Sequence, residues 1–241
     1  MTYTMVVLTI NMRDILNTEE GYKEIICKNN EYIKLEFEDL NSYVVSDDND
    51  KIKETYWNLL NYTLDVLKAE YSLGSDVGNL LDFYKKTSQY ILKSWIPESG
   101  YVQMIDMLSL GIILDIEDEE FNKLVALVEK ENVKDYLIDF LIRSRNSSWP
   151  QTEGFIWKKP YKGISEIVSC AAEDKEKAMA HLKKYLNEWY RSIEIKTHNS
   201  KWNIHTGYWC WEAGALAKIL KLEDAALKNQ QYYPYDLVHW K

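Results

Sequence analysis

The 241-residue sequence has little of the residue types that break or cross-link a chain, with four prolines, nine glycines and three cysteines. Few prolines and glycines disfavour an all-β fold with many tight turns and favour long helices. The cysteines, Cys27, Cys170 and Cys210, are odd in number, and no close pair of them suggests a metal or redox motif. We therefore expect three reduced, mostly buried thiols.

Long apolar runs are also missing, since no stretch approaches the roughly 20 residues that a membrane-spanning helix needs. The run over residues 104–116 is too short and contains Asp106 and Asp115. The first eleven residues are a short apolar run without a basic start or a small-residue cleavage site, which is not typical of a signal peptide. We expect a cytoplasmic protein without membrane contacts, in which residues 1–11 form an N-terminal extension.

Positive charge is scarce in one half of the chain, and the net charge is −9. Residues 1–115 hold 10 Lys and Arg against 19 Asp and Glu, whereas residues 116–241 hold 19 of each kind. The whole excess of negative charge therefore lies in the N-terminal half. This balance excludes nucleic-acid binding through phosphates, which needs a basic patch, and favours a basic protein as the partner.

Aromatic residues are abundant, with nine Trp and eighteen Tyr. Residues 208–220 are apolar at almost every position, and Glu212 and Lys218 are the charged exceptions. A helix that is apolar nearly all round is a buried one, so we predict a central Trp-rich helix here with other helices around it. The loop over residues 146–162 and the tail over residues 232–240 are also aromatic, and we expect both to be held on the core.

Apolar residues recur at helical spacing along most of the remaining chain. Asn17, with Glu20 three residues later, resembles a capping box for the first helix, and Gly74 is placed to cap the second. Pro97 and Gly100 are expected to end the third. Helices are predicted over residues 17–40, 52–71, 75–92, 101–114, 119–129, 133–143, 163–171 and 173–191. The fold class is thus all-α, a bundle of about eight to ten helices in two fused subdomains, an acidic one over residues 12–115 and a C-terminal one over residues 116–241.

One pair of residues would suit an enzyme. Glu212 is a carboxylate inside an apolar helix, and His205 precedes that helix, so the two side chains, or Glu212 with Asp106, could do the acid–base work of a hydrolase. The alternative is that Glu212 faces the positive end of its helix and bonds a neighbouring side chain. The sequence contains no HExxH, GxGxxG, GxxxxGK[ST] or GxSxG motif, and we expect neither a metal nor a cofactor.

Three acidic clusters, over residues 36–39, 47–50 and 117–120, are the candidates for partner binding. Residues 47–50 loosely resemble a calcium loop but lack its glycine and its closing Glu at the required spacing. Solvated surface charge is the simpler interpretation of any one cluster, whereas their concentration in one half favours a face complementary to a basic partner. The candidate contact residues are Glu38, Asp39, Asp47, Asp48, Asp50, Glu117, Glu119 and Glu120. A helical scaffold for some other basic protein would show the same pattern.

From Tyr56 to Trp240 the chain resembles the PoNi family, the immunity proteins of polymorphic bacterial nuclease toxins. The matching segments are residues 69–74, 107–114, 134–141, 185–190, 207–220 and 232–238. Members typically begin near a Met-Arg-Asp, as at Met12–Asp14, and Gly111 and Gly214 stand where we expect Ala.

The resemblance implies an all-helical fold, no catalysis and a cognate toxin as the partner. That toxin would be a DNase of the PD-(D/E)xK type that a secretion system delivers between bacteria. We therefore expect an immunity protein that occludes the DNA-binding or active site of its toxin through an acidic surface.

Overall fold

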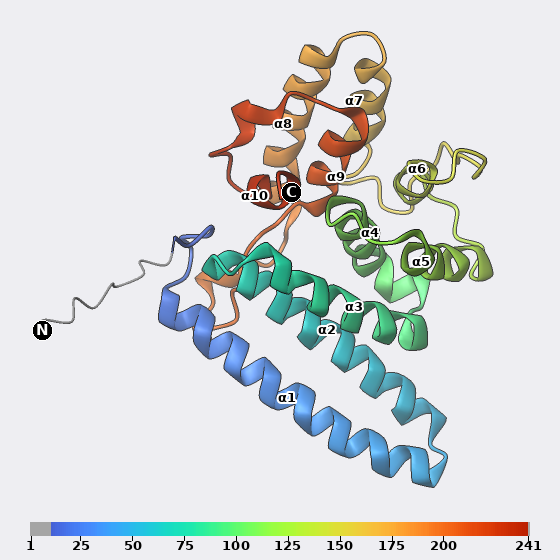
Figure 1. Ribbon diagram of the computed structural model, residues 1–241, viewed down its shortest axis with the longest axis vertical. Coiled ribbons are helices and arrows are strands. Elements are labelled where there is room, and N and C mark those ends of the chain that lie inside the picture. Colours follow the sequence, from blue (N-terminus) through green and yellow to red (C-terminus); the bar gives the residue numbers. More distant parts are fainter. Residues whose placement is uncertain (1–10, 241) are drawn as a thin grey trace, which may run out of the picture.

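The computed structural model describes residues 11–240, and in this part of the chain it contains ten α-helices, two 3₁₀ helices and no β-strand (Figure 1). The helices are α1 (Glu19–Ser46), α2 (Asn49–Leu73), α3 (Val77–Ser94), α4 (Pro97–Ile113), α5 (Asp118–Lys130), α6 (Tyr136–Arg143), α7 (Gly163–Ala171), α8 (Lys175–Ser192), η1 (Thr197–Asn199), α9 (Trp211–Leu220), η2 (Asp224–Leu227) and α10 (Tyr235–Val238). The all-α fold class is confirmed. The predicted N-terminal extension lies outside the described residues except for Asn11.

The two longest helices, α1 and α2, form an antiparallel hairpin; α3 packs against α2, and the tip of the hairpin extends beyond the other helices (Figure 1). Helix α1 is capped by Thr18, whose hydroxyl oxygen accepts a hydrogen bond from the N–H of Gly21 at 3.0 Å. The predicted cap at Asn17 is therefore wrong by one residue. The amide of Asn17 instead donates to Asn203 and to the carbonyl of His205, and so ties the start of α1 to the segment before α9.

Asp47 and Asp48 form the turn between α1 and α2. Asp47 has a left-handed backbone (φ 56°), and its N–H closes the last turn of α1 on the carbonyls of Tyr43 and Val44. The carboxylate of Asp48 accepts from the N–H of Lys51 and caps α2. Such caps satisfy backbone groups that a helix end leaves unpaired. The turn is therefore fixed by its own residues.

The boundary between α3 and α4 differs from the prediction. Asp76 caps α3, and Gly74 ends α2 as predicted, with φ 99°. Pro97, however, starts α4 instead of only ending α3. Proline is well tolerated at the first helical position, because the N–H that it lacks would have no partner there.

Helix α9 lies against α4 and α10 in the core (Figure 1). Its first residue, Trp211, is fully buried. The helix starts at Trp211, three residues later than the apolar run that predicted it. The preceding residues bend at Gly207 (φ 111°) and tie to the tail through the N–H of Cys210, which donates to the carbonyl of Tyr232. A methyl group at Gly214 would lie 3.0 Å from Ile113, so this glycine does allow α9 to approach α4 closely.

The aromatic loop and tail are held on the core as expected. Asp135 caps α6 and also accepts from the hydroxyl of Tyr101 and the N–H of Ile156, which lies in the loop. In the tail, Leu237 is fully buried, and the hydroxyl of Tyr233 donates to Asp224.

The three thiols are free, but only Cys210 is buried; Cys170 is half-buried and Cys27 is exposed, so the expectation of mostly buried cysteines is wrong. Cys27 lies on the outer side of α1, a position that the apolar pattern alone did not predict.

Between residues 11 and 240 the structure contains no helix that is both long and apolar enough to cross a membrane.

The bend at Gly207 should be sensitive to substitution. A methyl group there would lie 2.0 Å from the hydroxyl oxygen of Ser72, on a backbone with a positive φ that other residues rarely adopt. We expect Gly207→Ala to lower the free energy of unfolding by roughly 1–3 kcal/mol, measured by urea denaturation. Gly154→Ala is the control, because a methyl group added at Gly154 would meet no atom within 4 Å. Equal losses in the two variants would contradict this account of the bend.

Candidate functional site

Glu212 is sealed inside the bundle. It is 2% exposed, and one of its carboxylate oxygens accepts a hydrogen bond from the hydroxyl of Tyr185 at 2.8 Å. Burial, followed by repulsion from the nearby carboxylate of Asp106, raises the pKa of Glu212 to about 7. A hydrolase would need a solvent-open pocket beside this carboxylate, and the burial of Glu212 does not provide one.

A second ion pair joins half-buried Lys68 on α2 to the buried carboxylate of Asp106 on α4 at 3.2 Å. Burial lowers the pKa of Lys68, but the carboxylates of Asp106 and Asp65 outweigh that effect and raise it. For Asp106 the balance is the opposite, because burial outweighs Lys68 and raises the pKa. The pair joins α2 to α4 across the core and has the character of a structural contact.

His205 does not reach Glu212 and belongs to a different network. Its Nε2 lies 3.0 Å from a carboxylate oxygen of Asp14, and its Nδ1 lies 2.8 Å from the hydroxyl of Thr197. Burial raises the pKa of Asp14, but the hydrogen bond from His205 is among the effects that bring it below the ordinary value. The predicted catalytic pair is thus not formed, and His205 ties the start of the chain to the segment before α9.

Five of the eight predicted contact residues lie on the distal part of the hairpin, namely Glu38, Asp39, Asp47, Asp48 and Asp50. All are exposed except Asp48, which is half-buried because it caps α2. Within residues 11–240, the ion pairs of these five side chains are with close neighbours in sequence, from Lys34 to Glu38 at 3.8 Å and from Lys51 to Asp48 at 3.7 Å. Exposed pairs of this kind contribute little to stability, so the carboxylates remain available to a partner.

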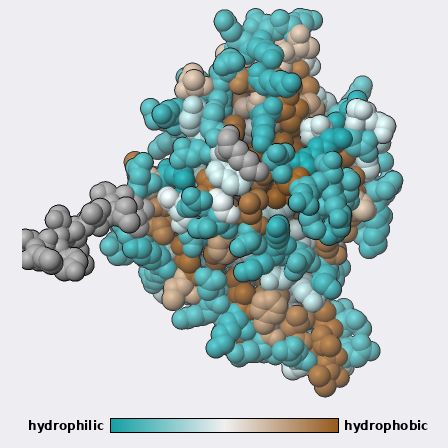
Figure 2. All heavy atoms as spheres, in the orientation of Figure 1, coloured by the Kyte–Doolittle hydropathy of each residue, from teal (hydrophilic) through white to brown (hydrophobic). Residues whose placement is uncertain are grey.

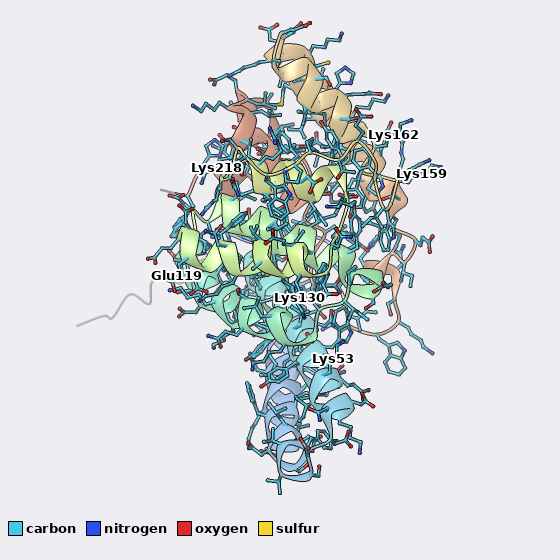
Figure 3. The ribbon with its side chains drawn as sticks, turned by 90° about the vertical axis from the view of Figure 1, so that its right-hand side faces the viewer. Lys53, Glu119, Lys130, Lys159, Lys162 and Lys218 are labelled. Carbon is cyan, nitrogen blue, oxygen red and sulfur yellow. The ribbon has the colours of Figure 1, made fainter. Side chains whose placement is uncertain are left out.

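The other three candidates, Glu117, Glu119 and Glu120, lie at the start of α5, where Figure 3 labels Glu119. Figures 1 and 3 both show the hairpin tip at the lower end of the molecule and α5 about halfway up, so the structure separates the eight residues into two regions. Glu119 and Glu120 are in the first turn of α5, where negative charge favours the positive end of the helix. A local structural role therefore accounts for part of this second cluster.

The exposed apolar residues of α1 were not predicted from the sequence. Leu35 is 53% exposed, Val44 59% and Val45 89%. Figure 2 shows hydrophobic residues reaching the surface at the lower tip, where α1 passes into α2. The feature of the sequence that could have indicated these exposed residues is the pair Val44 and Val45, which directly precedes the acidic turn. Spacing alone does not distinguish apolar residues that face the core from those that face solvent.

Two family models match the chain. The one described as "PoNe immunity protein (PoNi), N-terminal" matches residues 13–126, and the one described as "PoNe immunity proteins (PoNi), C-terminal" matches residues 133–237. Among solved structures, that of protein PA2201 from Pseudomonas aeruginosa has the same fold, with a TM-score of 0.63 over 97% of this chain and 98% of that one at 15% identity. No curated protein matches the chain.

The buried carboxyl of Glu212 should make stability depend on pH. Its folded pKa of about 7 exceeds the ordinary value of 4.5, so between these values the folded state holds more protons than the unfolded state. Stability from this group is present below pH 4.5 and is lost as the pH rises through 7, with a slope of up to about 1.4 kcal/mol per pH unit.

We expect the free energy of unfolding of Glu212→Gln to decrease less steeply with pH than that of the wild type between about pH 5 and 8. Urea denaturation at each pH measures this slope. Glu119→Gln, at an exposed position, serves as the control and should leave the slope unchanged. An unchanged slope in Glu212→Gln would show that other groups determine the pH dependence.

Proposed function

Because the chain belongs to the PoNi family of PoNe immunity proteins, we propose that it binds a cognate nuclease toxin and neutralises it through the acidic surface of its N-terminal half. The observation that supports this most directly is the exposed group of carboxylates on the α1–α2 hairpin, which lies in the half that carries the entire negative excess.

The electrostatics of a nuclease explain why such a surface would inhibit it. A DNase must present basic residues to the phosphates of its substrate. An acidic protein surface can occupy the same groove, and opposite charge also increases the rate of encounter. The immunity protein would then compete with DNA for the basic groove and needs no catalytic group of its own.

The function can be tested with the protein encoded by the neighbouring gene. Co-expression of the 241-residue chain should protect bacteria from growth arrest and chromosomal DNA degradation by that protein, and the two purified proteins should form a complex. Its association rate should fall as salt is raised, because ions screen the attraction between exposed charges. Failure of the wild-type chain both to bind and to protect would refute the proposed function for this pair.

Neutralising the two acidic clusters separately tests which one takes part. Asp47→Asn, Asp48→Asn and Asp50→Asn together remove three charges while keeping a cap at position 48 and a residue that tolerates the left-handed turn at position 47. We expect this triple variant to bind the toxin at least about tenfold more weakly with unchanged helicity by circular dichroism. The matched variant Glu117→Gln, Glu119→Gln and Glu120→Gln should lose less. If both triple variants bind as the wild type does, neither cluster is the contact.

A further inference from the structure

The outward face of α1 combines apolar and acidic side chains at helical spacing. Glu31, Leu35, Glu38, Ser42 and Val45 follow one another at intervals of four, three, four and three residues, and all are exposed. This spacing places them along one side of the helix. The buried residues of α1, including Tyr22, Ile25 and Leu40, lie on the opposite side, toward the rest of the protein.

The fold does not account for the two apolar members of this face. Leu35 is 53% exposed and Val45 is 89% exposed, so neither is buried against another helix. Valine is also a poorer helix former than the polar residues that usually occupy an exposed helical position. Single exposed apolar residues are common on protein surfaces, but these two share one face of an element that projects from the molecule.

The hairpin presents this face on a long helix that has caps at both ends. With 28 residues α1 is about 42 Å long, and its distal third is supported mainly by α2. The ring contact between Phe37 and Tyr90, with centroids 6.1 Å apart, brings the end of α3 against α1 about two thirds of the way along it. Beyond that point Figures 1 and 3 show only α1 and α2, joined by the capped turn at Asp47 and Asp48.

The charge around the face indicates what kind of surface it fits. Residues 31–54 contain eight Asp and Glu against three Lys, and the ion pairs described above are short-range ones within each helix or its cap. An apolar contact surrounded by carboxylates is complementary to an apolar groove surrounded by Lys and Arg. A second copy of this chain would instead bring two negative faces together, which is unfavourable.

The geometry points to the outward face of α1, residues 31–45, as the helix that enters a groove in the basic surface of the cognate toxin. Leu35 and Val45 are the apolar anchors, and Glu31 and Glu38 face basic residues of the toxin. This resembles the helix-in-groove mode of recognition, in which one face of a helix enters a groove; the two anchors are ten residues apart, about three helical turns. This assignment rests on the proposed function. It places the contact with the toxin on the α1–α2 hairpin and not at the start of α5.

The test uses the full chain and the purified protein encoded by the neighbouring gene. Leu35→Gln with Val45→Gln removes both anchors, keeps the charge and introduces a good helix former. The matched control is Ile15→Gln with Ile195→Gln, because these two apolar residues are 77% and 75% exposed outside α1. Circular dichroism and thermal unfolding establish that both variants are folded, and calorimetry or interferometry gives the Kd.

The expected result is a loss of at least about tenfold in affinity for Leu35→Gln with Val45→Gln and less than about twofold for the control. Retained affinity in the α1 variant, or equal losses in the two variants, would overturn the assignment while the wild-type complex still upholds the proposed function. A wild-type dimer that the α1 substitutions convert to a monomer in light scattering would also overturn it, since the face would then be a self-interface. Absence of any wild-type complex would count against the proposed function itself.

Discussion

The arrangement of the molecule depends on the joint that Ser72 makes at the end of α2. Its hydroxyl donates to the carbonyl of Thr206 and accepts from the indole N–H of Trp209, and its own carbonyl accepts from the N–H groups of Arg13 and Asp14. Three segments far apart in the sequence meet on this fully buried residue. Because the joint holds one end of the α1–α2 hairpin against the C-terminal half, the other end projects in a fixed direction.

The buried polar groups reinforce the same arrangement. Glu212 bonds Tyr185, Lys68 faces Asp106, and each pair joins helices from different parts of the chain. A buried charge is costly unless it has a partner, so such contacts favour one packing of the helices over others. The features that look enzyme-like in the sequence therefore contribute to the positioning of the helices.

The residues that form the core and those of the proposed contact face are different in this protein. The segments that resemble the PoNi family most strongly, residues 207–220 and 232–238, are largely in the core, around Trp211 and Leu237. The proposed contact face lies on the exposed side of α1, where no packing requirement fixes the side chains. A solved structure shares the fold at 15% identity, so this fold forms with many different side chains.

Local sequence patterns were enough to establish the all-α fold, most helix bounds and the burial of the Trp-rich segment, because helical spacing, caps and apolar content act over a few neighbouring residues. They misplaced the start of α9 at Trp211, where the preceding turn depends on distant contacts, and they assigned Pro97 to the end of α3 although it starts α4. The packing of whole helices was needed to show that His205 pairs with Asp14, 191 positions away, and not with Glu212. The same packing divided the acidic candidates between the hairpin and α5 and left Leu35 and Val45 in solvent, since local spacing does not specify which side of a long helix remains uncovered.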